Sequence, residues 1–340
     1  MLADREAPKH SRSSSRARTI VVGASHWHTP LYVPAMTDVH HVVGLSDVRP
    51  DLVDHLADLW DLPGVETDWR RLLDIPDVEL AYVFGAHDEM AAVCHALIER
   101  RIPFVVEKPL GTSLRELSAV RHAAADAGVP AAVPLVQRDG PVDAWLARAG
   151  TPVYSRFSFI AGPPERYLRN GNEWMLDGER AGGGCLANLG PHFVDLFLHG
   201  SRSTTAAVAG SIASTLHRGT VEDHATLVLT TSGGSEGIVE VGYAFPDSEL
   251  KRYCSFSSAG DAGFASINAD GSATFTSRDG HTEDTVFDVD SDPLYGTFVR
   301  RVAHTLDQGF RGLPGLSDLE AAMRIIWRAY DIAKEGRQDG

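Results

Sequence analysis

The sequence predicts an α/β protein in which a doubly wound parallel sheet precedes an α+β domain with a largely antiparallel open sheet. Three observations support this fold. Short β-branched runs alternate with helical patterns over residues 19–137. Strand-like segments with turn signals between them then follow one another up to residue 289. Two amphipathic helical patterns end the chain.

Length and composition fit a globular protein of two domains. The 340 residues suffice for two cores. We expect a first domain over residues 19–140 and a second over residues 141–335, whose last helix packs back on the rest. Residues 1–18 are polar and serine-rich, which predicts a disordered leader.

Charge and cysteine content exclude several classes of partner. The net charge of −15 argues against binding to nucleic acid or to an anionic membrane. No apolar run approaches the roughly 20 residues of a membrane helix. Cys94, Cys185 and Cys254 are widely spaced and form neither a zinc pattern nor a disulfide framework. A reducing cytoplasm is therefore the expected compartment.

The first predicted strand ends in a glycine turn. Residues 19–22 are β-branched, and Gly23 then opens the place of a G-x-G-x-x-G dinucleotide-binding turn. Ser25 stands at the second glycine position, where its hydroxyl can donate to a phosphate. His28 stands at the third, which normally permits close packing of helix on strand. His26 and His28 also suggest a metal site, but no carboxylate or cysteine cluster supports one, so we expect no metal.

The second predicted strand covers residues 41–47 and ends in Asp47. An acid at about this distance from the glycine turn holds the ribose hydroxyls of an adenosine. Its carboxylate repels a 2′-phosphate, which favours NAD(H) over NADP(H). Arg49 weakens that preference, and the alternative is that Asp47 only starts a turn.

A charged segment follows the central strand of the first domain. Residues 104–106 predict a short buried strand, which Glu107, Lys108 and Pro109 follow at once. Charges at the end of a buried strand are costly to desolvate, so they usually have a task or a partner. Lys108 at the carboxyl end of such a strand points to the crevice where ligands bind. The alternative is a solvated Glu-Lys pair.

The other predicted elements follow from periodicity and turn residues. In the first half we expect helices at 51–60, 69–73, 89–100 and 114–127, the last closed by Gly128, and strands at 78–84, 102–106 and 129–136. In the second half we expect an antiparallel meander of strands at 153–159, 206–212, 224–230, 237–245 and 251–257 with weaker pieces to 289, then helices at 293–306 and 317–333. Ser317 and Glu320 predict a capping box for the last helix.

A second polar constellation follows three glycines at residues 182–184. We expect a helix from about residue 186 to 199, on which Asn188, His192 and Asp195 share one face. An amide, an imidazole and a carboxylate beside a flexible turn indicate a site. The alternative is a solvated polar stripe with a packing histidine.

These residues resemble a known family. The turn at 19–28, Asp47, the Glu-Lys-Pro segment and the stretch 182–195 are similar to the glucose–fructose oxidoreductase / inositol dehydrogenase / MocA-like (Gfo/Idh/MocA) family, over residues 19–335. The resemblance implies a Rossmann domain that binds a nicotinamide cofactor, and an open-sheet domain for substrate and oligomer contacts. It also implies hydride transfer at a carbon of a sugar, sugar acid or cyclitol. A homodimer or homotetramer through the second sheet is expected.

The resemblance assigns roles by position. Lys108 matches the catalytic lysine, His192 the catalytic histidine, and Asn188 a position that is usually aspartate. Expected cofactor contacts are Gly23, Ser25, His26, Asp47, His87, Glu107 and Lys108. Expected substrate contacts are Arg138, Tyr154, Arg156, Arg169, Trp174, Asn188 and Asp195. Arg166 and Arg169, three residues apart, could together meet a carboxylate or phosphate on a sugar acid.

The chemistry follows from these residue types. Neutral His192 would remove the hydroxyl proton, and charged Lys108, oriented by Glu107, would stabilise the developing alkoxide. Asn188 cannot carry a proton, so a relay needs Asp195 or water, and the pKa of His192 should be lower than beside an aspartate. Two alternatives remain: a ligand-sensing protein that lost catalysis, and an enzyme that retains NAD and eliminates a glycosidic substituent.

Overall fold

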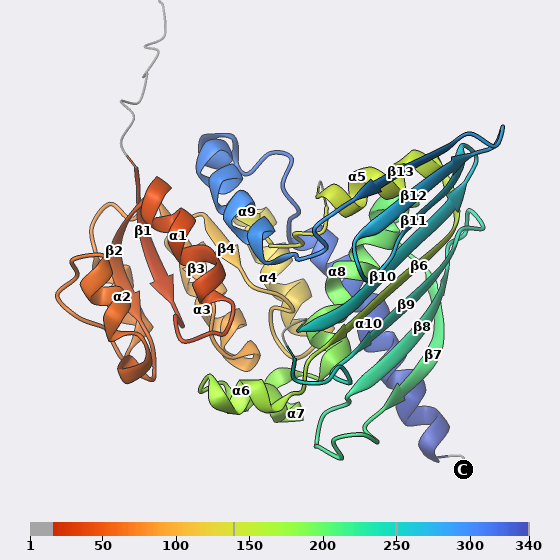
Figure 1. The fold of residues 1–340 in the computed structure, drawn as a ribbon. Coiled ribbons are helices and arrows are strands. Elements are labelled where there is room, and N and C mark those ends of the chain that lie inside the picture. The colour runs from red at the N-terminus through yellow and green to blue at the C-terminus, as the bar shows by residue number, and fades with distance from the viewer. Residues whose placement is uncertain (1–15, 139, 249–250, 339–340) are drawn as a thin grey trace, which may run out of the picture.

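The computed structural model describes residues 16–138, 140–248 and 251–338, which form two sheets and the helices around them (Figure 1). The predicted leader lies outside the described residues over positions 1–15. At its end the prediction was wrong, because Ala17 and Arg18 already belong to the first strand.

The N-terminal sheet is parallel and has five strands. Its strands are β1 (Ala17–Val22), β2 (His40–Ser46), β3 (Leu80–Val83), β4 (Phe104–Val106) and β5 (Ala131–Ala132). Their order, β2-β1-β3-β4-β5, reverses direction between β1 and β3. Ligands of such sheets bind at this switch point, beyond the carboxyl ends of the strands. The predicted fold class is confirmed.

Helices cover both faces of this sheet (Figure 1). They are α1 (Thr29–Val39), α2 (Asp54–Leu59), α3 (His87–Glu99) and α4 (Leu114–Ala127), with 3₁₀ turns at Pro50–Leu52 and Trp69–Asp74. The bounds of α4 agree with the prediction, since the Ser113 side chain accepts from the Glu116 amide at one end and Gly128 takes φ 65° at the other.

The strand β5 is much shorter than the predicted run of residues 129–136. Pro130 and Pro134 bracket it and have no N–H for a ladder. Val133 instead donates its N–H to the carbonyl of Pro314, from a distant part of the chain. Apolar composition alone therefore overestimated this strand.

The second sheet has eight strands. They are β6 (Pro152–Ala161), β7 (Ala207–Ala213), β8 (His224–Thr230), β9 (Glu236–Gly242), β10 (Arg252–Gly260), β11 (Gly263–Ile267), β12 (Ser272–Ser277) and β13 (Thr282–Val286). Their order is β13-β12-β11-β10-β6-β9-β8-β7. The simple meander was wrong at the centre, because β6 pairs in parallel with β9 and antiparallel with β10. The helices between β6 and β7 supply the long connection that parallel pairing requires.

The inner face of this sheet carries the apolar core. The helices of this half are α5 (Pro141–Leu146), α6 (Glu165–Arg169), α7 (Gly178–Ala181), α8 (Cys185–Gly200), α9 (Asp292–Thr305) and α10 (Leu316–Gln338), with short 3₁₀ turns between them. Buried α8 lies against the inner face, α10 packs on α8 and α4, and α9 packs on α1 of the first sheet (Figure 1). Phe157, Phe193 and Phe256 meet in that core.

The predicted capping box of the last helix was wrong. Ser317 lies inside α10, which begins at Leu316. The carboxylate of Asp318 accepts the amide of Gly315, and Glu320 pairs with Arg121 at 2.7 Å. Within the described ranges, no helix has the length and apolar character needed to cross a membrane.

Candidate active site

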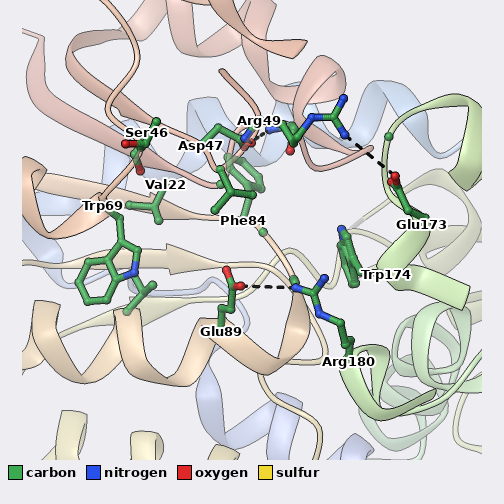
Figure 2. A pocket seen from close by; sticks show the side chains of 18 residues that line it. Val22, Ser46, Asp47, Arg49, Trp69, Phe84, Glu89, Glu173, Trp174 and Arg180 are labelled. Atoms are coloured by element: carbon green, nitrogen blue, oxygen red, sulfur yellow. Dashed lines mark hydrogen bonds and ion pairs between the residues drawn. The ribbon is translucent and has the colours of Figure 1, made fainter. Parts of the chain in front are cut away.

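A first pocket of about 310 Å³ lies at the switch point of the parallel sheet (Figure 2). We call it the switch-point pocket. It is lined by the ends of β1, β2 and β3 and by the segment before α7. Its walls include Gly23, Asp47, Phe84, Glu173 and Trp174.

Gly23 allows the ends of β1 and β3 to approach each other. Its φ is +72°, and an added Cβ would lie 2.6 Å from the Cα and the amide nitrogen of Gly85. A side chain would therefore meet rigid backbone as well as an unfavourable φ. The predicted glycine position is thus required by the packing around this pocket.

Asp47 is fixed at the edge of the pocket by backbone donors. Its two oxygens accept from the amides of Ser25 at 2.6 Å and Arg49 at 2.7 Å. The guanidinium of Arg49 turns away, to Asp51 at 3.0 Å and Glu173 at 4.0 Å. The carboxylate of Asp47 therefore stands in the pocket without a cation bound to it from the described residues, and the Ser25 amide is already used.

A wall of aromatic rings separates this pocket from a second one. We call His26, Trp27, Phe84, His87 and Trp174 the aromatic wall. The His26 ring lies 5.9 Å from Trp174 and 6.1 Å from Phe84 on one side, and 5.8 Å from Trp27 on the other. His87 packs edge-on to Trp174 at 4.8 Å, and its Nδ1 donates to the carbonyl of Ala181.

Several buried polar atoms of the glycine turn and of the adjacent end of β2 lack a hydrogen-bond partner within the part of the chain that the structure describes. They are Nε2 of His26, Nε1 of Trp27, Oγ1 of Thr29 and Oγ of Ser46. Such atoms carry a desolvation cost unless a ligand satisfies them. Of these four residues Ser46 lines the switch-point pocket, where its hydroxyl and the carboxylate of Asp47 fit the polar groups of a dinucleotide. These groups suit the adenosine half of the cofactor. The aromatic wall lies between this half and the second pocket.

The second pocket, of about 190 Å³, brings Lys108 and His192 together. We call it the reaction pocket. Lys108 follows β4, and His192 projects from α8, so the two sheets meet here. The rest of the lining comes from the turn before α1, from β6, α6 and β10, and from the start of α9, and it includes Trp27, His28, Arg166, Arg252, Asp292 and Tyr295.

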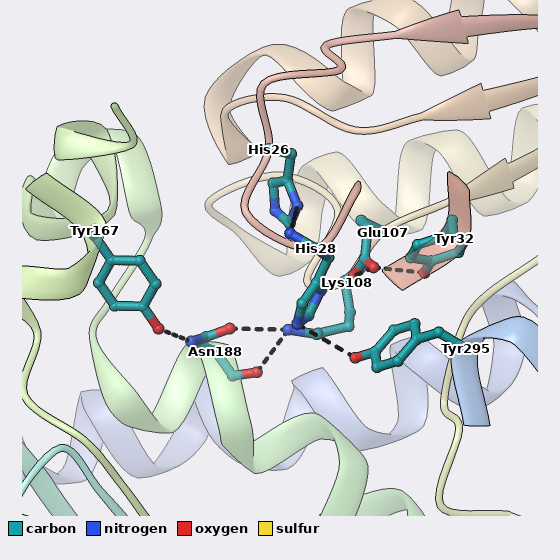
Figure 3. A network of polar contacts seen from close by, with 8 residues as sticks. All are labelled: His26, His28, Tyr32, Glu107, Lys108, Tyr167, Asn188 and Tyr295. Atoms are coloured by element: carbon teal, nitrogen blue, oxygen red, sulfur yellow. Dashed lines mark hydrogen bonds and ion pairs between the residues drawn. The ribbon is translucent and has the colours of Figure 1, made fainter. Parts of the chain in front are cut away.

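Lys108 is buried and held by Asn188. Its Nζ donates to the main-chain and the side-chain oxygens of Asn188, both at 2.9 Å (Figure 3). Burial lowers the pKa of Lys108 to about 8, against the opposing effect of Glu107 and with a contribution from the nearby Arg166. The ammonium also lies 5.7 Å from the centre of the Trp27 ring.

Asn188 positions the lysine and does not line the reaction pocket. Its Nδ2 donates to the hydroxyls of Tyr167 at 2.7 Å and Tyr243 at 3.0 Å. With both ends of the amide engaged, the oxygen that faces Lys108 is fixed. The side chain of Asn188 is therefore engaged by Lys108 and two tyrosines, and its contact with substrate stays a prediction.

Glu107 does not orient the ammonium of Lys108, which corrects the expectation. Its Oε1 accepts from the Tyr32 hydroxyl at 2.6 Å and from Nδ1 of His28 at 3.0 Å, and its Oε2 accepts the Lys108 amide at 3.2 Å. The Tyr295 hydroxyl lies 3.3 Å from Nε2 of His28 (Figure 3). Burial lowers the pKa of His28, so a neutral ring donates to Glu107.

His192 presents a neutral imidazole to the reaction pocket. Burial lowers its pKa well below 6.5, and the charge of Lys108 lowers it further. Its Nδ1 is buried and has no hydrogen-bond partner in the described ranges. A neutral ring with an unused nitrogen can accept a proton from a bound hydroxyl.

Family models match both halves of the chain. One, described as an oxidoreductase family with an NAD-binding Rossmann fold, matches residues 17–134. The other, the GFO/IDH/MocA C-terminal domain, matches residues 147–265, so together they match most of the chain. The chain belongs to the GFO/IDH/MocA oxidoreductase family.

Individual members of this family are distant. D-apiose dehydrogenase of Rhizobium rhizogenes is 27% identical over 175 residues, which are 49% of this chain and 47% of that protein. The match therefore spans about half the length of this curated relative.

Solved structures show the same fold over nearly the whole chain. An Agrobacterium radiobacter oxidoreductase in complex with NAD⁺, L-tartaric acid and magnesium has a TM-score of 0.80 at 18% identity, covering 95% of this chain and 97% of that one. An inositol dehydrogenase homolog from Azotobacter vinelandii, complexed with NAD⁺, has 0.80 at 16% identity, covering 96% and 97%.

Two residues assigned to substrate through the GFO/IDH/MocA resemblance pair with each other instead. Arg138 donates to both oxygens of Asp195, at 2.7 and 2.5 Å, and also to Asp318 at 2.9 Å. Neither Arg138 nor Asp195 lines the reaction pocket. Their pairing connects α8 to the first turn of α10, which is a structural role.

Four other expected substrate contacts lie elsewhere. Tyr154 and Arg156 sit on the outer face of the large sheet, where Arg156 pairs with Glu240 at 3.7 Å. Arg169 is exposed and pairs with Asp247 at 3.0 Å. Trp174 lines the switch-point pocket. Of the residues considered for an anionic substrate, Arg166 alone lines the reaction pocket.

Sequence reasoning missed several residues of the reaction pocket. Trp27 and His28 stand in the glycine turn, so their position could have indicated a site role. Tyr295 and Arg252 come from an ordinary amphipathic helix and a strand, and no local pattern marks them. Among the described residues, no group of His, Cys, Asp and Glu side chains has the arrangement of a metal site.

Proposed function

We propose that this protein is an NAD-dependent oxidoreductase that transfers hydride to or from a carbinol carbon of a sugar, sugar acid or cyclitol. The observation that supports this most is the reaction pocket, into which a lysine ammonium fixed by Asn188 and a neutral His192 both open. Membership of an NAD-binding oxidoreductase family agrees with this chemistry.

We assign proton transfer to His192 and stabilisation of the developing negative charge to Lys108. Neutral His192 takes the proton of the bound hydroxyl as the carbon–hydrogen bond breaks. The ammonium of Lys108 donates to the same oxygen and stabilises its growing negative charge. In the reverse direction His192 returns a proton to the forming alcohol. The nicotinamide, when bound, supplies the hydride acceptor or donor.

The preference for NAD over NADP rests on the edge of the switch-point pocket. The carboxylate of Asp47 would accept from ribose hydroxyls and repel a 2′-phosphate. Arg49, which weakened this preference at the sequence level, has its guanidinium bound to Asp51 and near Glu173. Ser46 lines the same pocket, and its buried hydroxyl, which has no partner among the described residues, would bind the adenosine half as well.

The substrate class agrees with what related proteins are named for. The relatives include a D-apiose dehydrogenase and an inositol dehydrogenase homolog, and one structure holds L-tartaric acid. All three names point to small polyhydroxylated compounds. A pocket of 190 Å³ has room for one such unit.

A sensing role is the second candidate. The aromatic wall between the two pockets favours it, because a protein that only binds a ligand has no need to place a nicotinamide ring beside Lys108. The retained lysine and histidine favour catalysis. The NAD-retaining elimination reaction uses the same two residues and differs in leaving no net change in the cofactor.

We further infer a homodimer or homotetramer formed through the outer face of the large sheet, in a reducing cytoplasm. Apolar side chains lie on that face, and the three cysteines are buried free thiols.

The proposal is tested by cofactor titration followed by a substrate screen. We expect NADH to bind, and a panel of sugars, sugar acids and cyclitols to give absorbance changes at 340 nm. His192→Ala should lower kcat by about 10²- to 10⁴-fold. His199→Ala, an exposed histidine of the same helix, is the matched control. Absence of NADH and NADPH binding, or an unchanged rate in His192→Ala, would refute the proposal.

A further inference from the structure

We infer that the substrate of the reaction pocket carries a carboxylate and that Arg166 recognises it. This deepens the proposed function, on which it rests for placing the reacting carbon at Lys108 and His192. The feature that carries the inference is a guanidinium without a counter-ion inside the pocket.

Arg166 lines the reaction pocket but pairs with no carboxylate among the described residues. Its Nε is buried and has no hydrogen-bond partner, and one of its terminal nitrogens donates to the Tyr167 hydroxyl at 2.8 Å. Arg252, in the same pocket, is different: it pairs with Asp290 at 3.2 Å and with Asp292 at 3.0 Å. Within one pocket, therefore, one arginine is neutralised and the other is available.

The surroundings of Arg166 orient its charge without neutralising it. Its guanidinium carbon lies 4.8 Å from the centre of the Tyr167 ring, 5.4 Å from Tyr243 and 5.9 Å from Trp27. Aromatic faces attract a guanidinium and set its plane, but they supply no opposite charge. A partly buried cation of this kind is costly unless an anion binds to it.

The side chains that line the reaction pocket carry an excess of positive charge, which also favours an anionic substrate. Four cationic side chains line it, and Asp292 is the single carboxylate that the described residues contribute to its lining. That carboxylate is already paired with Arg252. The protein as a whole has a net charge of −15, so this local excess of positive charge is specific to the pocket.

Hydrogen bonds fix the position of Arg166 relative to Lys108. Tyr167 accepts from Arg166 at 2.8 Å and from Nδ2 of Asn188 at 2.7 Å, and Asn188 in turn accepts from Lys108 at 2.9 Å. A molecule that places a hydroxyl carbon at Lys108 can thus place its carboxylate at Arg166. One guanidinium suits one carboxylate through two parallel hydrogen bonds.

The test compares compounds that differ only in the carboxylate. Binding to the NADH-saturated protein is measured by calorimetry for uronates and their neutral hexoses, for aldonates and their polyols, and for hexose 6-phosphates. We expect at least one carboxylate to bind at least tenfold more tightly than its neutral twin. Arg166→Gln should remove that difference, and Arg169→Gln, an exposed neighbour on the same helix, should keep it.

Arg166→Lys is a second variant in case Arg166→Gln does not fold. It keeps the positive charge and loses the paired N–H donors of the guanidinium. It should retain part of the preference. Equal binding of neutral twins, a preference for phosphates alone, or a preference that survives in Arg166→Gln would overturn the inference. If a carboxylate binds through Arg166 but no hydride transfer is seen, the anion site stands and the proposed oxidoreductase function fails.

Discussion

At the scale of single residues, Lys108 sets the expected pH dependence. Burial lowers its pKa to about 8, so the ammonium is present below that pH and is lost above it. His192, whose pKa is lowered well below 6.5, stays neutral throughout this range. We expect kcat/KM for oxidation to be level between about pH 6.5 and 8 and to fall by up to about tenfold per pH unit above 8. Steady-state rates across buffers of constant ionic strength measure this.

A charge placed beside Lys108 tests whether the fall in kcat/KM above pH 8 comes from deprotonation of this lysine. Asn188→Asp keeps an acceptor for the ammonium and adds a negative charge, which raises the pKa of Lys108. The alkaline fall should move to higher pH in this variant. Asn268→Asp, in the exposed turn between β11 and β12, should leave it in place. An alkaline fall at the same pH in all three proteins would mean that another group controls it.

The residue scale also shows where sequence reasoning stops. Lys108 and His192 could be found because each follows a recognisable local pattern, and the fold brings both to one pocket. The partners of Glu107 could not be found from the sequence. Tyr32 and His28 belong to a helix and a turn whose position depends on the whole sheet. The ion pair of Arg138 with Asp195 could not be predicted for the same reason, since it joins distant segments of the chain.

At the scale of elements, the glycine turn between β1 and α1 is the critical connection. A methyl group on Gly23 would press on the backbone of Gly85 and would sit at a φ of +72°. We expect Gly23→Ala to lower the free energy of unfolding by about 1–3 kcal/mol and to weaken NADH binding. Gly233→Ala is the control, because a Cβ there meets its nearest atom at 3.8 Å.

Urea unfolding and a fluorescence titration with NADH measure both effects. Equal stability and equal NADH affinity of Gly23→Ala and Gly233→Ala would show that the turn does not require a glycine at position 23. Loss of binding with unchanged stability would place the role of Gly23 in cofactor contact alone.

Elements with their own stop signals were predicted well. Helix α4 has a capping serine and a closing glycine in its sequence, and its bounds were exact. The short length of β5 was not predicted, because the N–H of Val133 bonds to distant Pro314 instead of to the sheet. The parallel pairing of β6 with β9 was not predicted either, because it depends on a long connection between them. Local patterns carry no information about such distant partners.

At the scale of the whole molecule, no helix of the described residues covers the outer face of the large sheet (Figure 1). Val228 and Ile238 face each other across β8 and β9, and Tyr253 and Phe264 are 42% and 45% exposed on the neighbouring strands β10 and β11. An apolar face of this kind usually marks an interaction surface. A second copy of the chain is the expected occupant, as the family resemblance implied.

We therefore expect the purified protein to sediment as a dimer or tetramer at micromolar concentration. Val228→Glu places a charge on the outer face, on β8, and should shift the protein toward monomers without unfolding it, because burying an unpaired carboxylate in an interface costs several kcal/mol. Leu216→Glu is the matched control, since Leu216 is 60% exposed but lies in the loop after β7. A monomeric wild type, or an oligomer that survives Val228→Glu, would show that this sheet face is not the contact between copies.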